Sequence, residues 1–99
     1  MSFADFLQSI AVDAQPPEEL GCALAALWHD QRGQWETAHI LAQEDLGKEG
    51  SWVHAYLHRK EGDEANSAYW YRLAGRPLAR GTLAAEWEQI VKALLDRRR

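Results

Sequence analysis

Apolar residues recur along this chain three and four positions apart, which is the spacing of an amphipathic helix. No stretch flanked by turn residues alternates between apolar and polar positions, so the pattern carries no strand signal. Six helices are therefore expected, and the predicted fold class is all-α. Their apolar stripes cover residues 3–14, 20–28, 35–45, 52–57, 65–73 and 83–94.

Residues typical of helix ends lie between these stripes. Ser2, Asp63 and Thr82 are expected to be N-caps, because their short polar side chains accept hydrogen bonds from free backbone N–H groups. Glycines at positions 33, 62 and 75 follow the second, fourth and fifth stripes, where a residue in the left-handed conformation ends a helix. In the fifth helix the residues expected to face the core are Ala65, Ala68, Tyr69 and Leu73.

Two segments of the chain resemble each other at a spacing of 29 residues, which is the distance from Leu24 to Val53. Residues 24–33 read Leu-Ala-Ala-Leu-Trp-His-Asp-Gln-Arg-Gly, and residues 53–62 read Val-His-Ala-Tyr-Leu-His-Arg-Lys-Glu-Gly. In each segment a glycine ends one helix and directly precedes another. The repeating unit is therefore an antiparallel helix pair, and stacked pairs of this kind form an α-solenoid.

The second of these glycines opens a segment that resembles the second-helix half of a tetratricopeptide repeat. The matching residues are Gly62, Asp63, Asn66, Ala68, Tyr71 and Ala74. The unit is shorter than the repeat of about 34 residues, and the alanine after the glycine is displaced by one position. The resemblance implies a tetratricopeptide-like α–α superhelix. Ninety-nine residues at 11.3 kDa leave room for one core, so a single domain over 1–99 is predicted.

The central part of the chain, over about residues 20–95, also resembles a family of small helical proteins of bacteria and fungi, most of them uncharacterised. One motif is Trp-x-x-Ala-His at residues 35–39. The other begins as Trp-x-His-Ala-x-x-His-Arg-x-Glu-Gly-Asp at residues 52–63 and continues through Asn66, Tyr69-Trp70-Tyr71-Arg72 and Gly75-Arg76-Pro77. The resemblance implies a family and no particular activity.

The charges are distributed unevenly along the chain. Residues 1–50 hold nine acids and two bases, whereas residues 51–99 hold six acids and nine bases, for a net charge of −4. A net acidic chain is a poor match for nucleic acid, whose binding needs neutralised phosphates. Complementary charges between helices or subunits are the favoured explanation, and an anionic partner near Arg59, Arg72, Arg76 and Arg80 is the alternative.

The composition also bears on the cellular compartment in which the protein is expected. No run of about 18 apolar residues exists, so no membrane contact is expected, and the acidic N-terminus is unlike a secretory signal. The single cysteine, Cys22, excludes an intrachain disulfide, which favours a cytoplasmic protein. Cys22 lies in an apolar stripe and is expected to be buried and inert.

Histidines are the first candidates for a functional site. His54 and His58 are four residues apart on one helix face, with Glu61 one turn further, and His39 on the preceding helix is a third candidate ligand. The residues between His54 and His58 lack the glutamate of a metalloprotease helix. Hydrogen-bonding histidines at a helix interface are therefore the favoured interpretation, and His54 and His58 remain weak candidates for a metal site.

Polar residues around the predicted turn at Gly62 form the second candidate. The structural interpretation makes Asp63 a cap, pairs Glu61 with Arg72, and bonds Asn66 to the backbone. The functional interpretation is an anion or carboxylate site at Arg59, Arg72 and Arg76. Tyr69, Trp70 and Tyr71 are consecutive on one helix, so they cannot all be buried, and at least one is expected to line a groove or a subunit interface.

The chain lacks the motifs of common enzymes. No serine has a nucleophile-elbow context, and no glycine-rich phosphate loop is present, so no catalytic residue and no cofactor are assigned. The favoured function is a non-catalytic protein- or peptide-binding or scaffolding module, with a homodimer as an open option. Its predicted groove consists of His39, His54, His58, Arg59, Glu61, Tyr71 and Arg72. The alternative is a small-molecule or metal-binding site with a minor enzymatic activity, built on His39, His54, His58, Arg59 and Arg72.

Overall fold

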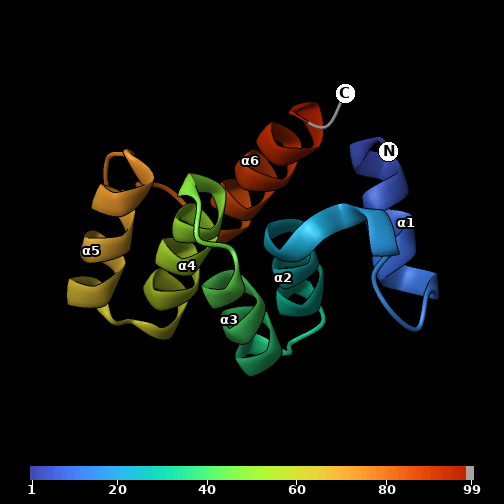
Figure 1. The fold of residues 1–99 in the computed structure, drawn as a ribbon, viewed down its shortest axis with the longest axis horizontal. Coiled ribbons are helices and arrows are strands. Elements are labelled where there is room, and N and C mark those ends of the chain that lie inside the picture. The colour runs from blue at the N-terminus through green and yellow to red at the C-terminus, as the bar shows by residue number, and fades with distance from the viewer. Residues whose placement is uncertain (98–99) are drawn as a thin grey trace.

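The structure of the protein is a computed structural model that describes residues 1–97 (Figure 1). Within this range it consists of six α-helices and one short 3-10 helix. No strand is present in this range, so the predicted all-α class with about six helices is confirmed. The last two residues of the domain predicted over 1–99 lie outside the described residues. The elements are α1 (Phe3–Val12), η1 (Glu18–Leu20), α2 (Gly21–Gln31), α3 (Trp35–Glu44), α4 (Lys48–Glu61), α5 (Glu64–Ala74) and α6 (Leu83–Asp96).

The helices pack as two antiparallel pairs, as the repeat predicted. Short turns join α2 to α3 and α4 to α5, and each pair is in close contact along its length (Figure 1). Helix α6 packs across the two helix pairs and contacts α4, α2 and α1, so the end of α6 lies on the same side of the molecule as the start of α1 (Figure 1). None of the helices within residues 1–97 is long and apolar enough to cross a membrane.

Helix α4 is the centre of the molecule, because α2, α3, α5 and α6 all pack against it. Nine consecutive residues, 50–58, are buried. Its apolar residues predicted a stripe over 52–57, but the helix begins four residues earlier, at Lys48. Since neighbours surround α4, its polar residues Ser51, His54 and His58 are buried as well.

The predicted caps are confirmed. Ser2 and Asp5 form a capping box at the start of α1, in which each side chain accepts a hydrogen bond from the other's backbone N–H. The Thr82 hydroxyl accepts from the Ala85 N–H at the start of α6. At the α4–α5 turn, Gly62 has φ 89°, a left-handed value that other residues rarely adopt.

The buried face of α5 differs from the prediction. Tyr69 and Leu73 were expected in the core but are 49% and 46% exposed, and Ala65 is exposed too. The buried residues are Ser67, Tyr71 and Ala74. The reason is that α5 faces polar groups: the Ser67 hydroxyl donates to the Ala55 carbonyl, and the Tyr71 hydroxyl donates to Glu86. The three consecutive aromatic residues are not all buried, as expected, because Tyr69 is half exposed.

Tryptophans join the helices through their indole N–H groups. Trp28 of α2 is fully buried and donates to the Ser9 hydroxyl of α1, and Trp87 of α6 donates to the Leu27 carbonyl of α2. Trp35 of α3 donates to the Leu57 carbonyl of α4. Trp28 and Trp87 are buried and Trp35 is half-buried, and each indole N–H donates to a group on another helix.

Candidate metal centre

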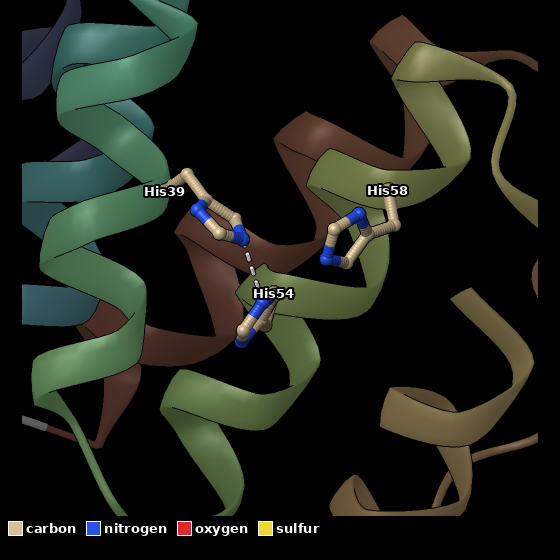
Figure 2. A group of neighbouring side chains, drawn as sticks. All are labelled: His39, His54 and His58. Atoms are coloured by element: carbon tan, nitrogen blue, oxygen red, sulfur yellow. Dashed lines mark hydrogen bonds between the residues drawn. The ribbon is translucent and has the colours of Figure 1, made fainter. Parts of the chain in front are cut away.

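Three histidines converge between α3 and α4 (Figure 2). His54 and His58 lie on successive turns of α4 and share one face, and the packing of α3 against α4 brings His39 opposite them. One ring nitrogen from each of the three lies within 4.8 Å of the other two. The Nε2 atoms of His39 and His54 are 2.9 Å apart. The three residues are called the histidine triad below.

Two tryptophans hold the rings of the triad. The Trp35 indole stacks on His39 with the ring centres 4.9 Å apart and an angle of 9° between the planes. The Trp70 indole of α5 stacks on His54 at 3.8 Å and 15°. Because His39 and His54 each have an indole ring against one face, the orientation of these two imidazoles is fixed before any ligand binds.

A carboxylate orients the third ring. Glu61 Oε1 lies 2.6 Å from His58 Nδ1, so Nε2 is the nitrogen left for the triad. Metal-binding histidines commonly make such a bond from their second nitrogen to a carboxylate. The predicted pair between Glu61 and Arg72 is wrong, because Glu61 bonds to His58 and Arg72 is exposed without an ion pair among residues 1–97.

Burial and mutual repulsion keep two of the histidines neutral. Burial, followed by the positive charges of His39 and His58, lowers the pKa of His54 to about 4. Burial also lowers the pKa of His39, with repulsion from His58 adding and attraction to Glu61 opposing. A neutral imidazole carries the free lone pair that a metal ion requires, so these two rings are competent ligands at neutral pH.

The geometry of the triad fits a tetrahedral ion. Ligand nitrogens around Zn²⁺, each about 2.1 Å from the ion, are about 3.4 Å from one another. The Nε2 atoms of His39 and His54, 2.9 Å apart, are closer than this value, and the other nitrogen pairs of the triad lie within 4.8 Å. Small side-chain rotations would close the triad on an ion and leave the fourth position open.

A second cluster of candidate metal ligands, which shares His58 with the triad, lies at the Gly62 turn. His58, Glu61 and Asp63 also approach within 4.8 Å of one another. Here the carboxylates are already engaged, because Asp63 accepts from both the backbone N–H and the side-chain amide of Asn66. The cap predicted at Asp63 is confirmed, whereas the expected bond from Asn66 to the backbone is replaced by this bond to a side chain.

The remaining predicted groove residues lie away from the triad. Arg59 Nη1 is 2.9 Å from Glu86 Oε1, and the Tyr71 hydroxyl is 2.5 Å from Glu86 Oε2, so both residues face α6. Arg72 belongs to neither group. The structure therefore divides the predicted groove into the triad with Glu61, the pair around Glu86, and the exposed Arg72.

Sequence reasoning missed Glu86 and the stacking role of Trp35. Glu86 is only 4% exposed, and its signal was its position three residues after Leu83 and four before Ile90, which places it on the apolar stripe of its helix. Cys22 also differs from expectation, because it is half-buried rather than buried, with its Sγ 3.9 Å from Glu44 Oε2.

Comparisons with known proteins add no relative to these observations. A scan against protein-family models, a search of curated proteins and a search of solved structures find no match for this chain. The likeness to small bacterial and fungal helical proteins and to tetratricopeptide repeats therefore stays a prediction carried by the residues over about 20–95.

Proposed function

We propose that the protein binds one divalent transition-metal ion, with Zn²⁺ the best match, at His39, His54 and His58. The observation that carries the proposal is the convergence of three imidazoles from two helices, each held in place by a stacking or hydrogen-bonding partner. Hydrogen bonding alone needs only two rings, and the third ring has its own carboxylate, as a metal ligand would.

The donor set selects the class of metal. Three neutral imidazoles suit Zn²⁺, Cu²⁺ or Ni²⁺, whereas Mg²⁺ and Ca²⁺ prefer oxygen ligands. The fourth position would take water or an anion. A groove of about 320 Å³, lined in part by Leu46, His54, Trp70 and Leu73, opens beside the triad and would give small molecules access to this position.

The test is a zinc titration of protein purified without an affinity tag, against a chromophoric chelator. We expect wild-type protein to bind one Zn²⁺ per chain. His54→Gln should bind zinc at least about 100-fold more weakly, because it removes one of the three ligands. His29→Gln is the matched control. His29 is the remaining histidine, and its Nδ1 is 2.6 Å from Gln34 Oε1, outside the triad.

Glu61→Gln tests the orienting carboxylate. The amide can still accept from His58 but carries no charge, and we expect zinc affinity to fall about 10- to 100-fold. Far-UV circular dichroism of each variant checks that the helices remain. If wild-type protein takes up no zinc, or if His54→Gln and His29→Gln bind it equally well, the proposal is overturned.

A protein- or peptide-binding module is the second candidate function. The observation that favours it is that Leu46, 94% exposed, and Leu73, 46% exposed, line the same groove. A second copy of the chain is the partner to test first. Sedimentation equilibrium should show self-association that Leu46→Glu abolishes and Val12→Glu, a change at another exposed apolar residue, leaves intact. A monomer at all concentrations would exclude the homodimer.

A further inference from the structure

A second cavity of about 740 Å³ lies under the loop 76–81, between α4, α5 and α6. Its walls include Trp52, Arg76, Leu78, Arg80 and Glu86, and it shares no residue with the histidine triad. This volume is within the range of sites for small organic molecules, about 300–1,000 Å³. The cavity is therefore a separate candidate site from the proposed metal centre.

Two arginines of this cavity have no acidic partner. Within residues 1–97 neither Arg76 nor Arg80 forms an ion pair. The acid in the wall, Glu86, is already engaged by Arg59 and by the Tyr71 hydroxyl. The cavity thus presents two guanidinium groups that form no ion pair with a carboxylate of residues 1–97.

The surroundings of Arg76 favour an incoming anion. Its guanidinium lies over the Trp52 ring, 3.3 Å from the ring centre. Burial, and then the positive charge of Arg97, lower the pKa of Arg76, with Glu86 opposing. A negatively charged group placed beside Arg76 would relieve both effects and gain charge-assisted hydrogen bonds.

The loop side of the wall is apolar, whereas Tyr71, Glu86 and Gln89 add polar groups from α5 and α6. Pro77, Leu78 and Ala79 of the loop line the cavity together with the Trp52 ring, and Leu78 is 61% exposed. The end of the loop is held in place because the Arg59 guanidinium donates to the Gly81 carbonyl while also pairing with Glu86. The cavity therefore has a basic side, formed by Arg76 and Arg80, and an apolar side on a loop whose end is held by a hydrogen bond.

We infer that this cavity binds a small organic carboxylate that has an apolar body. The carboxylate contacts Arg76 and Arg80, and the body lies against Pro77, Leu78 and Ala79 of the loop. The combination favours this ligand over two simpler ones: an inorganic anion would leave the apolar wall uncovered, and a neutral molecule would not pair with the two guanidinium groups.

The test uses three probes on the full chain: 4-phenylbutyrate, its neutral counterpart 4-phenylbutanol, and inorganic phosphate. Isothermal titration calorimetry measures affinity, and the NMR shift of the Trp52 indole N–H locates the binding. We expect phenylbutyrate to bind at least tenfold more tightly than either other probe. Arg80→Gln should weaken it at least fivefold, and Arg76→Gln at least as much.

Arg72→Gln is the matched control, because it removes the same charge from an exposed arginine of α5 that does not line the cavity. Arg80→Gln is the deciding variant, since Arg76→Gln also removes the contact with Trp52. Equal binding of alcohol and carboxylate, equal binding of phosphate, or equal weakening by Arg72→Gln would each overturn the inference. Repeating the titration in His54→Gln with chelator present separates this site from the metal centre, and binding should persist there.

Discussion

At the residue scale, His54 shows how an ordinary titratable group becomes a constrained one. It is 3% exposed, stacked on Trp70, and 2.9 Å from His39 through its Nε2 atom. Burial disfavours a positive charge on the ring, and the charges of His39 and His58 oppose it as well. The folded protein therefore holds His54 in the neutral form that binds metals, and folding is coupled to proton binding at this position.

We expect the metal-free protein to lose stability as the pH falls from about 6.5 to about 4. The folded-state pKa of His54 is about 4 and its ordinary value is 6.5, so across this window the unfolded chain binds a proton that the folded chain does not. Protonation of His54 in the unfolded chain lowers the free energy of unfolding by roughly 3 kcal/mol. This loss is complete below about pH 4 and absent above about pH 6.5. Urea unfolding at several pH values in the presence of chelator measures it.

His54→Gln is the variant that isolates this effect. Its unfolding free energy should depend less on pH than that of wild type between pH 6.5 and 4, while His29→Gln should keep the wild-type slope. The pKa values of Asp5 and Asp63 are lowered mainly by hydrogen bonds at the start of their helices. Their protonation therefore destabilises the protein only below about pH 4, outside this window. Parallel curves for His54→Gln and wild type would contradict the assignment.

The sequence predicted the members of the triad but not what surrounds them. The four-residue spacing of His54 and His58 places them on one helix face, and the predicted helix pairs allowed His39 to join them. The stacking of Trp35 and Trp70 depends on the register of α3 and α5 against α4. Side-chain periodicity within one helix carries no information about that register.

At the element scale, α4 depends on a close approach at its first turn. A Cβ added to Gly50 would lie 2.2 Å from the backbone carbonyl oxygen of Asp45, which belongs to the connection between α3 and α4. A carbonyl of the main chain cannot move aside as a flexible side chain can. Only glycine therefore lets the connection pack against the helix at this point.

Gly50→Ala should destabilise the protein by at least about 2 kcal/mol, because either α4 or the connection must shift. Gly47→Ala is the comparison three residues away, where an added Cβ would meet only the side-chain oxygen of Asp45 at 3.3 Å. We expect its cost to be less than half that of Gly50→Ala. Urea unfolding of both variants measures the difference, and equal costs would show that the approach at Gly50 is not limiting.

The helices themselves were largely predictable, whereas their buried faces were only partly so. Caps at Ser2, Asp63 and Thr82 are local features, and local features can be read from sequence. Helix α5 was assigned the wrong face because apolar periodicity favoured Tyr69 and Leu73. The face that is buried instead presents hydroxyl groups to partners on α4 and α6, which only the packed structure supplies.

At the scale of the whole molecule, two ion pairs join the acidic first half of the chain to its basic second half. Lys60 of the basic half is 2.9 Å from Asp30 of the acidic half, and Arg97 is 3.3 Å from Glu49. Asp30 is 2% exposed and also accepts from the Tyr56 hydroxyl, so α2 and α4 are joined by a buried polar contact. Complementarity between helices or subunits was the favoured explanation of the asymmetry, and these two pairs are contacts between helices of one chain.

Three helices meet at Glu86, which makes this residue a junction of the fold. Arg59 of α4 and Tyr71 of α5 both bond to its carboxylate on α6, and the side chain of Glu86 is 3% exposed. Burial of an ionised carboxylate is tolerated only while these partners remain, because a lone charge in the interior is strongly disfavoured. The path by which α6 returns to this point was not visible in any local pattern of the sequence.

Arg59→Met should therefore destabilise the protein by about 3 kcal/mol or more, since it leaves the Glu86 charge with Tyr71 alone. The double variant Arg59→Met with Glu86→Gln should recover part of the loss, because the neutral amide can still accept from the Tyr71 hydroxyl. Lys92→Met, which breaks the exposed pair with Glu88, should cost less than about 1 kcal/mol. Urea unfolding of the four proteins decides the matter: if Arg59→Met costs no more than Lys92→Met, Glu86 is not the junction that holds α6 against α4 and α5.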